Sequence, residues 1–176
     1  TSNETYDQYV ATQKQLEERD ARAKEEKDQK ISPQVQEVLD KGNEFLRKIR
    51  ESNDAIPGEE ISRKISRMEL IVKRILERAQ EHPEIVPDLK KMMSYYLPIT
   101  VKLLNAYADM DKQPVQGENV TKVKAEISDT LDTINTAFEN LLDSLFQDTA
   151  WDVSSDISVL HTMLAQEGLT EDGLKK

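Results

Sequence analysis

Apolar residues recur at intervals of three and four along most of this chain, which is the spacing of one face of an α-helix. Five such stripes can be followed, and prolines, glycines and polar runs separate them. We therefore predict helices over about 33–50, 61–79, 87–110, 120–145 and 157–164, with loops at 51–60 and 109–119. Because no stretch has the alternating pattern of a strand, the predicted fold class is all-α.

The expected architecture is an antiparallel bundle of five to six helices, which can be elongated, with a charged N-terminal helix. Residues 14–30 form the charged part, since after Leu16 their only apolar residues are Ala21 and Ala23. Such a segment has good helix formers and opposite charges at helical spacing, but no apolar stripe to bury. We accordingly divide the chain into a charged helical stalk or tail at 1–31 and a helical bundle domain at 32–173.

Two side chains carry specific structural expectations. Pro98 lies within YYLPITVKLLNAY at 95–107, the most apolar run of the chain. Proline has no amide hydrogen and crowds the carbonyl of the residue four positions earlier, here Ser94, so we expect a bend in this helix. Trp151 is the only tryptophan and is expected to pack in the corner between the last two helices. The neighbours of Pro98 that we expect in the core are Tyr96, Leu97, Thr100, Leu103, Leu104 and Tyr107.

Charge narrows the range of partners. The net charge is −10, from 34 acidic and 24 basic residues, so we predict no nucleic-acid partner. Residues 125–174 contain eleven carboxylates and no Lys or Arg, whereas residues 63–78 contain six basic and two acidic residues. These segments can be two helix faces of opposite charge that pack side by side. Alternatively, the basic segment binds a protein partner or an anionic membrane surface; the oligomeric state stays open.

The familiar catalytic motifs are missing from the sequence. There is no cysteine, which excludes thiol catalysis, disulfides and thiolate metal sites. There is also no phosphate-binding glycine loop, no GxSxG motif and no HExxH motif. The helical pairs Asp129/Asp132 and Asp152/Asp156 have oxygen ligands of the kind that Mg²⁺ and Ca²⁺ prefer. We interpret them instead as helix-start and surface aspartates, and predict no metal site and no cofactor.

Three blocks resemble the 5-bromo-4-chloroindolyl phosphate hydrolysis protein family. They are YYLPITVKLLNAY, ISDTLDTINTAFENLLDSLFQD and DVSSDISVLHTMLAQEGL, and the resemblance covers roughly residues 60–170. It implies a bacterial protein linked to cleavage of a chromogenic indolyl phosphate, with hydrophobic segments often placed before this domain. It brings no catalytic residue set. Because the chain starts at Thr1 and not at Met, we expect a trimmed product, which a membrane anchor can precede in the full-length protein.

Two functional hypotheses follow. The first is a non-catalytic helical interaction or scaffold module, in the cytoplasm and tethered to the membrane in the full-length protein. The second is a phosphate-monoester hydrolase acting on the indolyl phosphate, for which Asp152, Asp156 and His161 are the candidate catalytic residues. Whether the chain is an enzyme therefore stays open. A closed pocket lined by the basic helix at 63–78 and facing the aspartates would favour catalysis, and an open basic face would favour binding.

Overall fold

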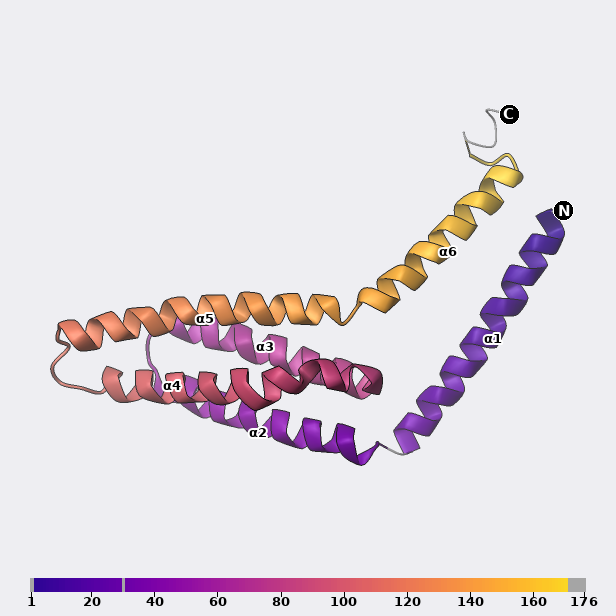
Figure 1. The fold of residues 1–176 in the computed structure, drawn as a ribbon. Coiled ribbons are helices and arrows are strands. Elements are labelled where there is room, and N and C mark those ends of the chain that lie inside the picture. The colour runs from indigo at the N-terminus through magenta and orange to yellow at the C-terminus, as the bar shows by residue number, and fades with distance from the viewer. Residues whose placement is uncertain (1, 30, 171–176) are drawn as a thin grey trace. The chain divides into compact units, whose positions relative to one another are not determined.

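The protein is all-α, as predicted. The computed structural model describes residues 2–29 and 31–170, with side chains from 3–23 and 31–170, and no strand occurs among them. Within these residues, six α-helices and two short helical segments, η1 and η2, follow one another (Figure 1). They are α1 (Ser2–Gln29), α2 (Pro33–Ala55), α3 (Glu59–Glu81), η1 (Pro83–Leu89), η2 (Met92–Tyr96), α4 (Leu97–Asp111), α5 (Glu118–Ser144) and α6 (Gln147–Gln166).

These elements form two units. One contains α1 and α6, and the other is Ile31–Leu145, which contains α2 to α5 with η1 and η2. The division of the chain at 31/32 that the sequence favours stays a prediction, but by contacts α6 belongs with α1.

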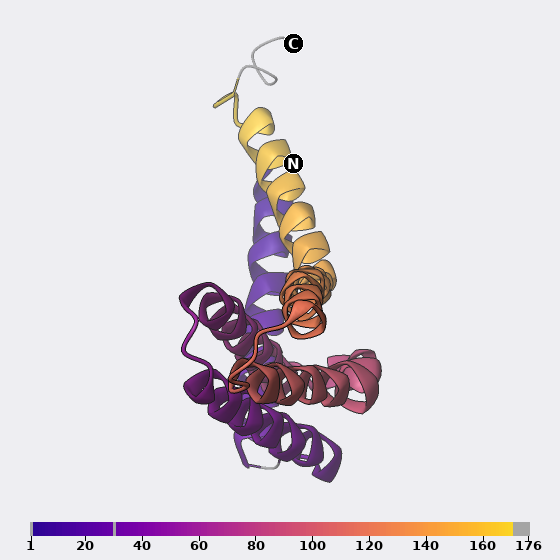
Figure 2. The ribbon, with the colours of Figure 1, turned by 90° about the vertical axis from the view of Figure 1, so that its left-hand side faces the viewer.

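The larger unit is a four-helix bundle with a diagonal connection. Successive helices from α2 to α5 run in opposite directions (Figure 1), and Figure 2 views them from the end that carries the α2–α3 and α4–α5 loops. Contacts join α2 to α3, α3 to α5, α5 to α4, and α4 to α2. Since α3 and α4 are not neighbours in this ring, the chain must cross from one to the other through η1 and η2, which contact α2 on the way.

Helix α3 supplies the largest share of the core. Its sequence has the strongest apolar face of the bundle, and the apolar residues of that face are all buried. Hydrophobic burial of this kind is worth about 25 cal/mol per Å² and is the main term that holds such a bundle together. The buried apolar residues of α3 are Ile61, Ile65, Met68, Ile71, Val72, Ile75, Leu76 and Ala79.

Helix α2 begins as the sequence predicts and ends later. Ser32 Oγ accepts a hydrogen bond from the amide of Val35 at 3.3 Å, and Pro33 takes the first helical position. The helix then continues to Ala55, although a loop was expected from residue 51. Tertiary hydrogen bonds explain the extra turn: Ser52 Oγ donates to Asn105 Oδ1 at 3.2 Å, and Asn53 bonds Ser62 and Ser66.

The structure shows how the chain accommodates Pro98. The five residues Met92–Tyr96 form a π-helical turn, in which the amide of Leu97 donates to the carbonyl of Met92, five residues earlier. A π-turn of this kind is commonly found where a residue interrupts the regular i→i−4 backbone hydrogen bonds of an α-helix. Pro98 then sits in the first turn of α4, where a missing amide costs little. The predicted disturbance is thus a π-turn before the proline.

Two predicted core residues lie on the surface. Tyr96 is 47% exposed. Trp151 is 63% exposed, and α6 has no buried residue at all. The other residues named beside Pro98 are buried (Leu97, Thr100, Leu104) or half-buried (Leu103, Tyr107).

The end of α6 agrees with its sequence. Gly168 has a φ of +69°, which favours glycine. The amide of Gly168 donates to the carbonyl of Ala165 at 3.1 Å, and that of Leu169 donates to Leu164 at 3.0 Å. This pair of hydrogen bonds is a Schellman motif, a common helix terminator.

Candidate functional site

The three candidate catalytic residues all lie on α6, and all three are exposed. Asp152 and Asp156 stand four apart and share one side of the helix. At 100° per residue, His161 lies roughly 140° around the helix from Asp156, so the helix itself does not bring its ring to the aspartates. Asp156 Oδ1 accepts a hydrogen bond from Gln13 Nε2 of α1 at 3.2 Å. The role of these residues in catalysis stays a prediction.

The described carboxylates do not cluster in the way a metal centre requires. Asp129 and Asp132 lie on α5, far along the chain from the pair on α6. Among the residues that the structure describes, His, Asp and Glu side chains nowhere gather in a group of three or more that would hold a metal ion.

The basic helix and the acidic helix pack side by side, which confirms the first interpretation of the charge pattern. Lys64 Nζ of α3 lies 2.9 Å from Asp132 Oδ2 of α5, and Arg67 Nε lies 3.2 Å from Glu139 Oε1 of the same helix. Arg74 instead pairs within α3, with Glu77 at 3.3 Å. Much of the positive charge of α3 is therefore neutralised by α5 and by α3 itself.

Lys64 is the centre of a partly buried polar network. Besides Asp132, its ammonium donates to Ser128 Oγ at 2.9 Å and to the Ser128 carbonyl at 3.2 Å. Asn135 Nδ2 in turn donates to the carbonyl of Lys64 at 2.9 Å. The hydrogen bond to Asp132 raises the pKa of Lys64 above its usual value, so the side chain stays charged. This is the opposite of what a lysine acting as a base or nucleophile requires.

Arg78 closes the far end of the same interface. Its side chain is buried, and one guanidinium nitrogen, Nη2, lies 3.5 Å from the carbonyl of Leu145, at the end of α5. A cation near the carboxyl end of a helix is favourable because of the helix dipole. The Arg78 side chain thus contacts the carboxyl end of α5.

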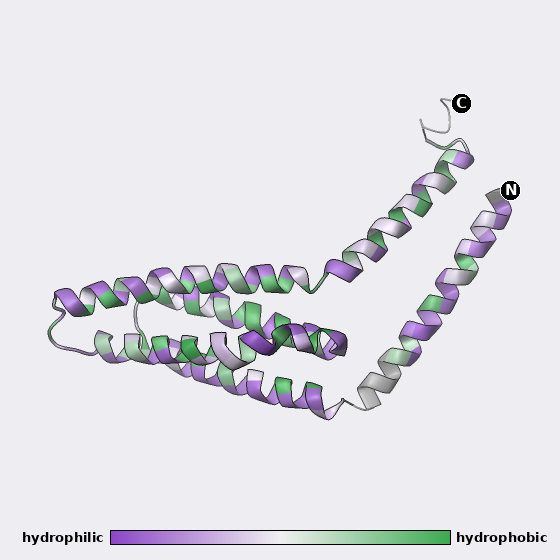
Figure 3. Ribbon diagram, in the orientation of Figure 1, coloured by the Kyte–Doolittle hydropathy of each residue, from purple (hydrophilic) through white to green (hydrophobic). Residues whose placement is uncertain are grey.

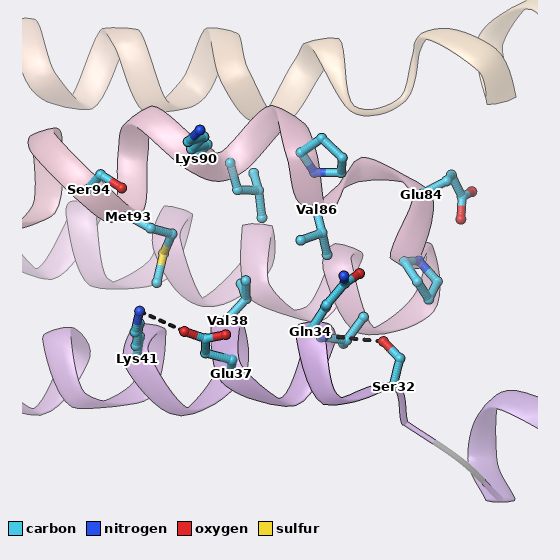
Figure 4. A pocket seen from close by; sticks show the side chains of 14 residues that line it. Ser32, Gln34, Glu37, Val38, Lys41, Glu84, Val86, Lys90, Met93 and Ser94 are labelled. Atoms are coloured by element: carbon cyan, nitrogen blue, oxygen red, sulfur yellow. Dashed lines mark hydrogen bonds and ion pairs between the residues drawn. The ribbon is translucent and has the colours of Figure 1, made fainter.

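A hollow of the four-helix unit lies elsewhere. It is an open groove of about 690 Å³ between the start of α2 and the segment from η1 to η2 (Figure 4). Val38, Val86 and Met93 line its apolar part, and the Lys41–Glu37 ion pair, at 2.9 Å, lies at its edge. None of the three candidate catalytic residues lines it. The proline-rich segment at 83–87 forms part of one wall of this groove.

Comparison with known protein families shows to which family the chain belongs. The model of the 5-bromo-4-chloroindolyl phosphate hydrolysis protein family matches residues 7–160 of the 176. The chain belongs to this family. The match begins much earlier than the resemblance seen at 60–170, so the charged N-terminal segment is part of the family's sequence pattern.

Other comparisons add nothing to the family assignment. No curated protein sequence and no solved structure is significantly similar to the chain. Within residues 2–29 and 31–170, every helix is too short or too polar to traverse a lipid bilayer.

Proposed function

We propose that this member of the indolyl phosphate hydrolysis family is a non-catalytic helical interaction module of a bacterial envelope-associated protein. The observation that carries the proposal is the exposed apolar side of α6. Val153, Ile157 and Leu160 are each about half exposed, and no residue of this 20-residue helix is buried. Exposed apolar residues that are contiguous on one face commonly mark an interaction surface.

The charged groups favour the same proposal. Hydrolysis of a phosphate monoester normally needs a metal pair, an activated nucleophile or several cations around the phosphoryl oxygens. Lys64 and Arg67 are engaged by carboxylates of α5, and the raised pKa of Lys64 keeps it in its charged form. These cations serve the packing of α3 on α5.

The alternative is a hydrolase that acts on the indolyl phosphate itself, with Asp152, Asp156 and His161 as the reacting groups. The family's description favours it, since it names this hydrolysis. In our proposal the phenotype is indirect and arises through envelope permeability or another enzyme.

Complementation distinguishes the two functions. A strain that lacks the gene is supplied with the full-length wild-type protein, with D152N/D156N/H161Q, which removes the ionisable groups but keeps side chains that can hydrogen-bond, or with V153D/L160D, and hydrolysis of the indolyl phosphate by cells is measured. We expect the triple variant to complement and V153D/L160D to fail. The matched control is S158D, on another side of α6, which should complement. Loss of complementation by the triple variant alone, at equal protein level, would favour the hydrolase.

We further propose that the domain lies in the cytoplasm and is tethered to the membrane in the full-length protein. The charged segment at 14–30 would suit a spacer between an anchor and the bundle. Fractionation of cells that express the full-length protein tests this: we expect the protein in the membrane fraction, resistant to a salt wash. Recovery in the soluble fraction would contradict the tether.

A further inference from the structure

A regular apolar seam runs the length of α6. The seam residues follow one another at intervals of four, three, four, three and four, which is the heptad spacing of a coiled coil. The central three, Val153, Ile157 and Leu160, are 50%, 48% and 51% exposed. Green residues recur along α6 when the ribbon is coloured by hydropathy (Figure 3). The seam consists of Phe146, Ala150, Val153, Ile157, Leu160 and Leu164.

Helix α1 contacts a different side of α6. Gln13 bonds Asp156, which flanks the seam, and Val159 and Met163 on that side are half-buried. The central residues of the seam are left open by this contact. They are also more apolar than a solvent-facing side of a helix needs to be.

From this seam we infer that α6 binds α6 of a second copy of the chain as a parallel two-stranded coiled coil. The inference rests on the proposed function, an interaction module, and names its partner. The heptad assignment places Ala150, Ile157 and Leu164 at position a, and Val153 and Leu160 at position d. A β-branched residue at a with leucine at d, as at Ile157 and Leu160, favours two parallel strands.

Charge on the flanks selects the same partner. Helix α6 carries three aspartates and no Lys or Arg. Asp148 and Asp152 fall on the outer positions f and c, so they do not face a second α6 across the seam. Only Asp156 at g and His161 at e carry ionisable groups beside it. In a parallel dimer, position g of one helix faces position e of the next heptad on the other helix, and so Asp156 faces His161 of the second copy.

A second copy therefore meets no like charges at the seam and gains two symmetric Asp156–His161 contacts. A two-fold pairing of identical surfaces also closes at the dimer. The seam is short, at roughly 30 Å for 20 residues, so we expect association to be reversible and dependent on concentration.

Sedimentation equilibrium of the purified chain tests the association. We expect a monomer–dimer equilibrium for the wild-type protein and at least a tenfold weaker association for I157D, because the dimer would bury two like charges. S158D, which adds the same charge off the seam, should dimerise as the wild type does. Circular dichroism checks that each variant keeps its helices. A wild-type chain that stays monomeric at all concentrations overturns the inference.

Disulfide trapping tests the parallel orientation. Because the chain contains no cysteine, only the introduced cysteines can form a disulfide. L164C lies near one end of the seam, so two copies cross-link at this position only if the helices are parallel and in register. T162C, on the outer side, is the control and should not cross-link. Equal cross-linking of both, or cross-linking only in a mixture of L164C with A150C, overturns the parallel pairing.

The dimer and the proposed function can fail independently. A monomeric chain would contradict the dimer and leave the proposed function standing, whereas direct turnover of the indolyl phosphate would contradict that function and leave the dimer.

Discussion

At the scale of single residues, Gly42 sets how closely α2 and α3 approach. A Cβ added at this position would lie 2.5 Å from both methyl carbons of Leu76, which is itself buried. The absence of a side chain therefore lets Leu76 pack directly against the backbone of α2. Leu76 has little freedom to move, because dense packing surrounds it.

We predict that G42A lowers the free energy of unfolding by about 1 kcal/mol. Overpacking costs about 1–3 kcal/mol, and the better helix propensity of alanine returns about 1 kcal/mol. In an L76A background the sign should reverse, because the added methyl fills part of the cavity left by the leucine. Urea unfolding of the four proteins of this cycle measures both effects. A destabilisation by G42A that is unchanged in the L76A background would contradict the close contact.

Glu69 is a second residue whose effect on folding stability can be measured. It lies on α3, burial raises its pKa, and the guanidinium of Arg50, which is 3.6 Å away, is exposed. Its Oε1 atom is buried and accepts no hydrogen bond from the described protein atoms. A carboxyl group of this kind destabilises the fold when it is ionised.

We predict that E69Q stabilises the protein at pH 7 but not below about pH 4. The folded pKa of Glu69 lies above the unfolded value of about 4.3, so the native state holds the proton more tightly. Stability is therefore lost as pH rises from the unfolded pKa through the folded one, and the full cost is present above both. Thermal unfolding at several pH values, with E126Q on the exposed side of α5 as the control, measures the difference. A Tm gain that is equal at pH 4 and pH 7 would exclude ionisation as its cause.

At the scale of elements, ion pairs join α3 to α5, but the two described here differ in environment. The side chain of Lys64 is 16% exposed and has three acceptors, and its partner Asp132 is 59% exposed. In the other pair, Arg67 and Glu139 are 56% and 45% exposed. Water screens the attraction in an exposed ion pair. Forming such a pair also costs conformational entropy, because both side chains are otherwise mobile. The Lys64–Asp132 pair should therefore contribute more to the pairing of the helices.

We predict a coupling energy of about 1 kcal/mol for Lys64–Asp132 and about 0.3 kcal/mol for Arg67–Glu139. Double-mutant cycles with K64M/D132A and R67M/E139A, measured by urea unfolding, give the two values. Raising the salt concentration to about 1 M should remove the smaller coupling first, because the Debye length falls to about 3 Å. Equal couplings with equal salt dependence would contradict the distinction.

Periodicity predicted which elements form, but not where each one packs. The stripe of α3 and the stripe of α6 are both helical in period, yet every apolar residue of the first stripe is buried and no residue of the second is. The spacing of apolar residues shows that a helix has an apolar face, but it does not show which element packs against that face. Trp151 was misplaced for this reason, since its size alone suggested burial.

Boundaries depended on tertiary contacts that a sequence does not display. The hydrogen bonds of Ser52 and Asn53 to other helices extend α2 through a stretch of poor helix formers. Pro98 correctly marked an irregularity, but the presence of a proline does not by itself predict the π-turn over Met92–Tyr96 that precedes it.

At the scale of the whole molecule, the charge pattern was the most informative feature of the sequence. It predicted the packing of basic α3 on acidic α5, which the ion pairs confirm. The candidate catalytic residues, in contrast, came from a search for reactive side chain types. Spacing along one helix places Asp152 near Asp156, and it places His161 on another side. The groove beside α2 was missed, because its walls come from segments separated by more than 40 residues.

The most direct test of the proposed function is turnover of 5-bromo-4-chloroindolyl phosphate by the purified protein, with and without added Mg²⁺ or Zn²⁺. We expect no product above the buffer blank under either condition, and no difference between the wild type and D152A/D156A. Metal-dependent or metal-independent turnover by the wild type that the double variant loses would show a catalytic site on α6, and would contradict a non-catalytic module.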